Sequence, residues 1–262
     1  MSAATLEHVT ATPVQTGKPG IPFGRLFQVE FRKLFDTRAA RILLGLLAVG
    51  VLAIVTVMVF VGRGDDKSYA GFVEGAFMPV TMLLPVIAIL ATTSEWSQRT
   101  ALTTFMWEPR RVRVLSAKFV AAFIVAIFAA LTVLAFAAMG AGAATLTGSE
   151  LDWTSNGKVL AGYAILIFVL VGQGIAFGSL IHNTAGALVL YFMLPTVMTL
   201  LTSLIEPLRE IKEWIDINVA STPIIEGTFS GEALAHYATA VTLWVIIPGA
   251  IGVWRTLNRE AK

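Results

Sequence analysis

The feature that most constrains this chain is an apolar stretch from Val159 to Ile205, in which His182 is the only acidic or basic side chain. A helix needs about 20 apolar residues to cross the hydrocarbon core of a bilayer, so this stretch is too long for one crossing and fits two. His182, Asn183 and Thr184 form its one polar cluster, which predicts the turn between the two crossings. The expected spans are residues 159–181 and 185–205.

Four other apolar stretches of similar length occur in the chain, at residues 42–61, 71–93, 119–142 and 234–254. The chain is 56% hydrophobic and only 14% charged, which is typical neither of soluble domains nor of disordered chains. These features predict an all-α integral membrane protein with six transmembrane helices. Residues 21–255 would form one six-span domain, between a flexible tail at 1–20 and a short tail at 256–262.

Two amphipathic segments flank the spans. Between Ile21 and Arg38, phenylalanines can line one face of a helix that basic residues flank, a pattern typical of a helix lying in the membrane interface. An ordinary soluble helix is the alternative. Residues 206–220 are amphipathic but too charged to cross, so we expect an outer segment before the sixth span. It would rest on the membrane or dip back into it, and Pro223 would break it.

The basic residues are distributed unevenly between the two sides of this topology. With six spans both termini share one side, and most of the 19 lysines and arginines fall there or in the second and fourth loops. Most of the acidic residues fall on the other side. Because cytoplasmic loops carry an excess of lysine and arginine, the pattern predicts that both termini are cytoplasmic.

Several kinds of chemistry are absent from the sequence. There is no cysteine, the three histidines are far apart, and no HExxH pair occurs, so we expect no metal site. No nucleotide-binding P-loop occurs: Lys18 follows a glycine, but Pro19 stands where Ser or Thr is needed, and the upstream glycine is absent. The net charge of +2 and the lack of a basic stripe argue against nucleic-acid binding. We therefore expect a non-catalytic chain without a cofactor of its own.

The segment from Ser94 to Lys118 is a polar, basic interruption between the second and third spans. Apolar residues at helical spacing, including Phe105 and Met106, predict a short amphipathic helix that Pro109 ends. A basic neighbour such as Arg99, four residues on at a helical spacing, is a candidate partner for Glu95. One interpretation is a surface that a cytoplasmic partner grips, with Phe105 and Met106 as its apolar anchors. The other is a loop whose arginines only set the topology.

Within the spans, polar residues are scarce, so energy for any transport is expected to come from elsewhere. Gln173 lies in the fourth span next to Gly174, and Gly174 with Gly178 forms a small-xxx-small pattern that permits close helix contact. Packing within the chain is one interpretation of these three residues. A dimer contact or a substrate path is the other.

The layout and one loose motif resemble the permease subunit of an ATP-binding-cassette (ABC) transporter of the type-2 exporter family. Members of that family have a Glu, then Gly-Thr, then Pro with a basic residue, then a Lys entering the third span. The corresponding positions here are Glu95, Thr100, Pro109, Arg110 or Arg111, and Lys118. Arg99 stands where Gly is usual. The layout covers residues 21–255, whereas the motif is only moderately specific.

The resemblance implies a permease domain in a bacterial plasma membrane, with a separate cytoplasmic ATPase subunit that binds ATP and Mg²⁺. It also implies two permease halves, either a homodimer or a pairing with a similar permease, and export of a hydrophobic or amphipathic compound. Together with the apolar pattern, it gives a set of expected ATPase-coupling residues. These are Glu95, Arg99, Thr100, Phe105, Met106, Glu108, Pro109, Arg110 and Arg111.

Two other classes of function compete with this one. A membrane scaffold or sensor subunit would bind a partner protein and transport nothing. A membrane-embedded enzyme acting on lipid would need a catalytic constellation, which the sequence does not contain. Hydrolysis of ATP by a bound partner separates the exporter from the scaffold.

Overall fold

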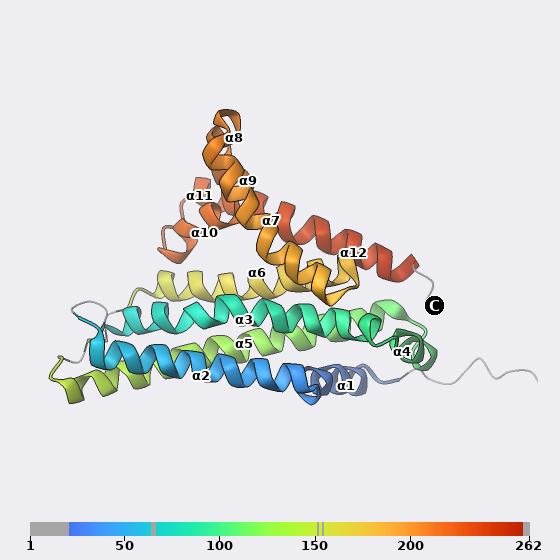
Figure 1. Cartoon of the computed structure of the whole chain (residues 1–262), viewed down its shortest axis with the longest axis horizontal. Coiled ribbons are helices and arrows are strands. Elements are labelled where there is room, and N and C mark those ends of the chain that lie inside the picture. Colours follow the sequence, from blue (N-terminus) through green and yellow to red (C-terminus); the bar gives the residue numbers. More distant parts are fainter. Residues whose placement is uncertain (1–20, 64–66, 151, 154, 259–262) are drawn as a thin grey trace, which may run out of the picture.

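The computed structural model describes residues 21–63, 67–150, 152–153 and 155–258, and every regular element within them is helical. Six helical runs are long and apolar enough to cross a membrane (Figure 1). They are α2 (Arg38–Val61), α3 (Tyr69–Ser97), α5 (Arg111–Ala144) with the 3₁₀ turn η2 (Thr145–Thr147), α6 (Gly157–Ile181), α7 (Thr184–Leu204), and α11 (Gly231–Val241) continued by the π-helical turn η3 (Thr242–Ile246) and α12 (Ile247–Asn258). The predicted all-helical architecture with six span-length helices is confirmed, and it indicates a multi-pass membrane protein.

Several span helices extend beyond the apolar stretches from which they were predicted. Helix α2 begins at Arg38, four residues before the predicted start, and α5 begins at Arg111, eight residues before it. Polar residues do not end a helix by themselves, so both helices continue past the apolar stretch until a cap or proline intervenes. The side chain of Thr37 caps α2 by accepting a hydrogen bond from the Ala40 amide at 3.1 Å.

The turn between α6 and α7 lies where the polar cluster predicted it. His182 ends α6 in the left-handed region, with φ of 55°. The side chain of Asn183 then accepts a hydrogen bond from the Gly186 amide at 2.9 Å and caps α7.

Helix α3 is the centre of the molecule and packs against α2, α5 and α6. Its side chains Phe72, Val80 and Leu84 are buried in the main apolar core. Helix α6 approaches α3 closely through two glycines. A methyl group on Gly174 would lie 2.7 Å from the carbonyl oxygen of Pro85, and one on Gly178 would lie 1.9 Å from Thr92 Oγ1. The small-xxx-small pattern therefore serves a contact within this chain.

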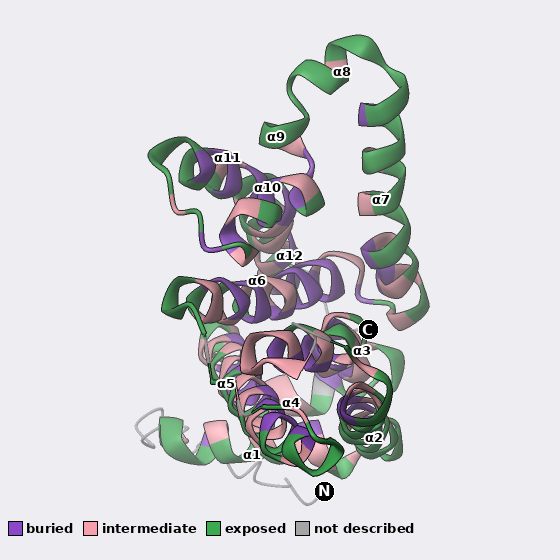
Figure 2. Ribbon diagram, turned by 90° about the vertical axis from the view of Figure 1, so that its left-hand side faces the viewer, coloured by how far each residue is buried: buried purple, intermediate pink, exposed green. Residues whose placement is uncertain are grey.

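Helix α7 stands apart from the rest of the bundle (Figure 2). Of its 21 residues, only Ala187, Tyr191 and Thr202 are buried. It leads into three short helices, α8 (Glu206–Glu210), α9 (Lys212–Ile215) and α10 (Ile217–Ile225). Helix α10 packs against α6 so closely that a methyl group on Gly162 would lie 1.9 Å from the Ile224 carbonyl oxygen.

The predicted single amphipathic helix at 206–220, broken by Pro223, is wrong in detail. The segment is divided at Ile211 and Asp216, and Pro223 lies inside α10. Asp216 starts this new helix, because its Oδ1 accepts a hydrogen bond from the Asn218 amide at 2.9 Å. Burial of the apolar side chains of α10 then outweighs the local preference of proline against helix.

Two further helices lie at one end of the bundle, together with the C-terminal end of α12 (Figure 1). Helix α1 (Phe23–Asp36) packs on α5 and α2, and its rings Phe27, Phe31 and Phe35 follow one another at centroid distances of 5.7 and 5.0 Å. Helix α4 (Ala101–Trp107) is the short helix expected between the second and third spans, and it ends two residues before Pro109.

Candidate functional site

Four charged side chains from three helices meet at this end of the bundle, and we call them the charge cluster. They are Glu30 and Lys33 of α1, Glu95 of α3 and Lys118 of α5. Lys33 Nζ lies 2.6 Å from Glu30 Oε1 and 2.6 Å from Glu95 Oε1. Lys118 Nζ lies 2.9 Å from Glu30 Oε2 and 3.3 Å from Glu95 Oε2. Each lysine therefore bridges both carboxylates, and the formal charges sum to zero.

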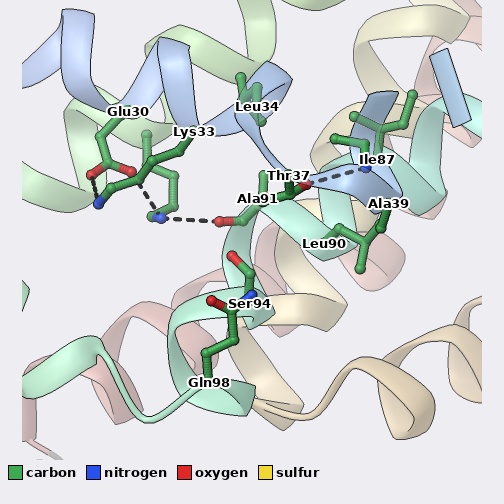
Figure 3. Close-up of a pocket in the computed structure, with 12 residues that line it drawn as sticks. Glu30, Lys33, Leu34, Thr37, Ala39, Ile87, Leu90, Ala91, Ser94 and Gln98 are labelled. Atoms are coloured by element: carbon green, nitrogen blue, oxygen red, sulfur yellow. Dashed lines mark hydrogen bonds and ion pairs between the residues drawn. The ribbon is translucent and has the colours of Figure 1, made fainter. Parts of the chain in front are cut away.

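Three of the four side chains of the charge cluster are buried, and the fourth is partly exposed. Glu30, Glu95 and Lys118 are 3%, 7% and 6% exposed, whereas the Lys33 side chain is 38% exposed. Lys118 Nζ also donates to the Ala91 carbonyl oxygen at 2.9 Å, and a cavity of about 70 Å³ borders Glu30 and Lys33 (Figure 3). Buried charges are tolerated when each is paired and hydrogen-bonded, as these are.

The charge of Lys33 is stabilised by this environment. Burial by itself lowers the pKa of Lys33, but the negative charges of Glu95 and Glu30 and their hydrogen bonds outweigh that effect. The net result is a pKa raised above the ordinary value of 10.5. Lys33 therefore remains a cation throughout the neutral range.

Helix α4 is joined to the charge cluster by one hydrogen bond, in which Thr104 Oγ1 donates to Glu95 Oε1 at 3.2 Å. A second connection lies just after α4. Buried Glu108 accepts a hydrogen bond from Arg113 Nη1 at 3.0 Å, and Arg113 Nη2 donates to the Ile21 carbonyl oxygen at 2.7 Å. Helix α4 is thus fixed to α3, to α5 and to the start of α1.

The C-terminal end of α12 closes the same region. Arg111 Nη1 donates to the carbonyl oxygens of Thr256 and Leu257 at 3.0 and 3.3 Å, and its guanidinium lies 4.8 Å from the centroid of Phe105. His182 Nε2 shares a hydrogen bond of 2.8 Å with Thr256 Oγ1. These contacts connect α4 and α5 with α6 and α12.

An apolar groove runs between α1 and α4, and we call it the α1–α4 groove. Its volume is about 630 Å³. Its walls are formed by Ile21, Pro22, Arg25, Leu26, Val29, Glu30, Lys33, Thr103, Thr104, Trp107 and Glu108. Trp107 is 76% exposed and its neighbour Met106 is 75% exposed. Two large apolar side chains therefore stand free at the edge of a groove, beside Glu30, Lys33 and Glu108, which are already paired.

The predicted coupling residues do not all lie as expected. The predicted Glu95–Arg99 pair is wrong: Glu95 pairs with Lys33 and Lys118, while Arg99 is exposed beyond the end of α3. The carboxylate points into the bundle because two cations from other helices lie there. Arg99 has φ of 57°, a left-handed conformation that glycine adopts without strain.

The predicted apolar anchor Phe105 is half-buried, because it packs against Leu26, Val114 and Ala117. Met106 is free, as expected, and Trp107 is the second exposed apolar side chain of α4, which the sequence reasoning missed. Thr100, Pro109 and Arg110 are exposed, whereas Glu108 is buried and Arg111 is partly covered.

Glu30 was also missed, although the sequence carries a signal for it. Leu26, Glu30 and Leu34 recur at intervals of four, so they share one face of α1, and all three are buried. An acidic residue in the middle of an apolar stripe predicts a buried partner of opposite charge. Its partner Lys118 is distant in sequence, so no local spacing could identify it.

Gln173, which the sequence suggested for packing or a path, is 3% exposed. It lies at the wall of a cavity between α3, α6, α7 and α10. Among the described residues, no three His, Cys, Asp or Glu side chains gather so as to hold a metal ion. No protein-family model matches this chain, and no curated protein matches it. Function is therefore inferred from the chain's own residues.

Proposed function

We propose that this chain is the membrane-spanning permease subunit of an ABC transporter of the type-2 exporter kind. It forms a path for a hydrophobic or amphipathic compound, and a separate cytoplasmic ATPase that binds ATP and Mg²⁺ drives it. The chain works as a homodimer or with a similar permease in a bacterial plasma membrane, and both of its termini are cytoplasmic.

The observation that carries this proposal is the way in which α4 is attached to the rest of the bundle. This short helix presents Met106 and Trp107 outward, while Thr104 is bonded to the charge cluster and Glu108 to Arg113. A force on the exposed side chains therefore reaches α1, α3 and α5 through partly buried hydrogen bonds and ion pairs. A loop that only sets topology has no need of such an attachment.

Two motif positions give further support. Glu95 and Lys118, which stand at the two ends of the resembling segment, form an ion pair of 3.3 Å. Arg99, at the position where the family has Gly, has the backbone conformation that favours Gly. Arg99 therefore departs from the family motif in its side chain, whereas its backbone conformation is the one that glycine favours.

The test is a matched pair of double variants in the full chain, purified in mild detergent from native membranes. Met106→Ala with Trp107→Ala removes the apolar anchors of α4. Leu146→Ala with Trp153→Ala removes an exposed leucine and tryptophan, 87% and 52% exposed, outside α4. The readout is vanadate-sensitive ATP hydrolysis that remains with the purified chain.

Wild type and the Leu146/Trp153 variant should retain the ATP hydrolysis, and the Met106/Trp107 variant should lose at least tenfold. Interface anchors of this type contribute about 2 kcal/mol each. Equal hydrolysis with the Met106/Trp107 variant would remove α4 as the coupling surface. A stable partner that shows no ATP hydrolysis with wild type would favour the scaffold or sensor alternative.

A further inference from the structure

The cavity beside Gln173 lies within this chain, away from the charge cluster and from α4. Its volume is about 360 Å³, within the range of small-molecule sites. Thr81 of α3, Gln173 of α6, Tyr191 of α7 and Ser221 of α10 are among its lining residues. Four helices thus contribute to the wall of one cavity. Figure 2 shows that one of them, α7, stands apart from the rest of the bundle.

The chemistry of the wall restricts what can occupy the cavity. None of the described residues that line it carries a charge, and apolar side chains such as Leu166 and Phe192 alternate with hydroxyls and amides. A charged ligand would lose its hydration here without gaining a counter-ion. A neutral amphiphile can bury its apolar part and keep a polar group near the hydroxyls.

One hydrogen-bond donor of the wall is unused. Gln173 Nε2 is buried and has no hydrogen-bond partner among the described residues. The hydroxyls of Thr81 and Thr196 already donate to carbonyl oxygens of their own helices. Asn218 Nδ2 donates to Thr199 Oγ1 at 3.3 Å. A buried amide donor without an acceptor is rare in native proteins, and a ligand oxygen is one way to satisfy it.

One wall of the cavity is formed by a helix that can adjust. Pro195 lies inside α7 and lines the cavity, and it has no amide hydrogen with which to bind the Tyr191 carbonyl oxygen. Helix α7 is also sparsely buried. Helix α7 is therefore the wall that can move to admit a ligand, whereas α6 is fixed against α3 through Gly174.

We infer that this cavity binds a neutral amphiphile through a carbonyl-type oxygen that accepts a hydrogen bond from the Gln173 amide. The ligand is either a bilayer lipid or a compound that the chain transports. Only the second source rests on the proposed function. Nε2 is closed off from solvent in this structure, so binding requires the side-chain amide to rotate about its terminal torsion, which is soft in glutamine.

The test uses benzophenone, a neutral molecule with one carbonyl oxygen and two apolar rings, which cross-links to nearby C–H bonds under ultraviolet light. The full chain is labelled in detergent without any ATPase, and mass spectrometry locates the labelled peptides. Labels are expected on the cavity segments of α6, α7 and α10. Gln173→Leu, which keeps the volume and removes the donor, should reduce this labelling at least tenfold. Gln28→Leu, the same change on the exposed face of α1, should leave it unchanged.

Equal cavity labelling of wild type and Gln173→Leu, or labels spread evenly over exposed apolar surfaces, overturns the inference. If Gln173→Leu does not fold, Thr196→Phe narrows the cavity from α7 and should lower the labelling in the same way; unchanged labelling then overturns the inference too. Displacement of the label by diacylglycerol identifies a lipid as the occupant, and resistance to it identifies a smaller amphiphile. Because no ATPase is present, this test of ligand binding is independent of the test of ATPase coupling at α4. Either test can fail while the other succeeds.

Discussion

The charge cluster and the Gln173 cavity are opposite solutions to placing polar groups inside a helical bundle. In the charge cluster, four ionised side chains satisfy one another, and they join α1, α3 and α5. In the cavity no described wall residue is charged, and the amide of Gln173 lacks a partner. The first arrangement favours a single geometry, because moving one helix separates charges; the second allows several.

The packing around the two sites differs in the same sense. Helix α3, which carries Glu95, has 13 buried residues, whereas α7, which lines the cavity, has three. A region with few buried contacts opens at lower free energy than a region with many. We therefore expect α1 to α5 to move as one body and α7 to adjust against it. Helix α10 has four of its nine residues buried and lies close to α6, so its freedom to move needs a separate test. A change at α4 would be transmitted by the first region and received by the second.

The largest loss of folding stability is expected when the charge of Lys118 is removed. Lys118→Met leaves Glu30 and Glu95 buried with only the half-exposed Lys33 to balance them. Breaking a buried ion pair from one side costs about 3–5 kcal/mol of folding free energy. The measurement is the thermal unfolding midpoint of the full chain in detergent, which should fall markedly relative to wild type.

The control for this prediction restores the charge balance. Glu30→Met combined with Lys118→Met leaves Lys33 and Glu95, which still form a pair at 2.6 Å. The double variant should therefore be more stable than Lys118→Met alone, because buried pairs replaced as a unit by apolar residues cost little. A double variant that loses the sum of both single effects would show that the cluster does not act as a unit.

The contrast between the two sites also separates what the sequence could and could not predict. Span existence and the α6–α7 turn followed from apolar length and from His182, because crossing a bilayer is a local requirement of length and polarity. The pairing of Glu95 with Lys33 and Lys118 did not follow, since it depends on which helices become neighbours. Local spacing suggested Arg99, and tertiary packing overrode it.

The Gln173 cavity could also be predicted only in part from the sequence. Gln173 stands out as a polar residue in an apolar span, and the neighbouring glycines predicted a close helix contact. The contact with α3 is present, whereas the cavity on the other side depends on how α7 leans and α10 folds back. The division at Asp216, which starts α10, was the step that the amphipathic pattern did not show.

An intermediate effect is expected when the two faces of α6 are compared by the same substitution. Gly174→Ala places a methyl group 2.7 Å from the Pro85 carbonyl oxygen on the fixed side. Gly162→Ala places one 1.9 Å from the Ile224 carbonyl oxygen on the adjustable side. If α10 can shift and α3 cannot, Gly174→Ala costs about 1–3 kcal/mol and Gly162→Ala costs less, although its overlap is larger.

Gly142→Ala in α5 is the matched control, because no atom lies within 4 Å of the added methyl group. It should stabilise the helix by up to about 1 kcal/mol. Unfolding midpoints of the three variants, measured side by side, decide the order. A greater loss for Gly162→Ala than for Gly174→Ala would mean that α10 is held as firmly as α3, and the distinction between the two regions would fail.

The smallest effect is expected at Lys33, and it tests whether the exposed edge of the charge cluster behaves differently from its buried side. The Lys33 side chain is 38% exposed, against 7% for Lys118, so water reaches the site and weakens the ion pairs. Lys33→Met should therefore cost about 1 kcal/mol, less than Lys118→Met.

Because the pKa of Lys33 is raised by Glu95 and Glu30 against the lowering effect of burial, its contribution to stability is complete below the ordinary pKa of 10.5. That contribution is lost only as the pH rises through the raised pKa. The difference in unfolding midpoint between wild type and Lys33→Met should stay constant from neutral pH to about pH 10 and shrink above it. A difference that already shrinks between pH 7 and pH 9 would mean that the carboxylates do not hold the proton on Lys33, and the paired geometry of the cluster would have to be abandoned.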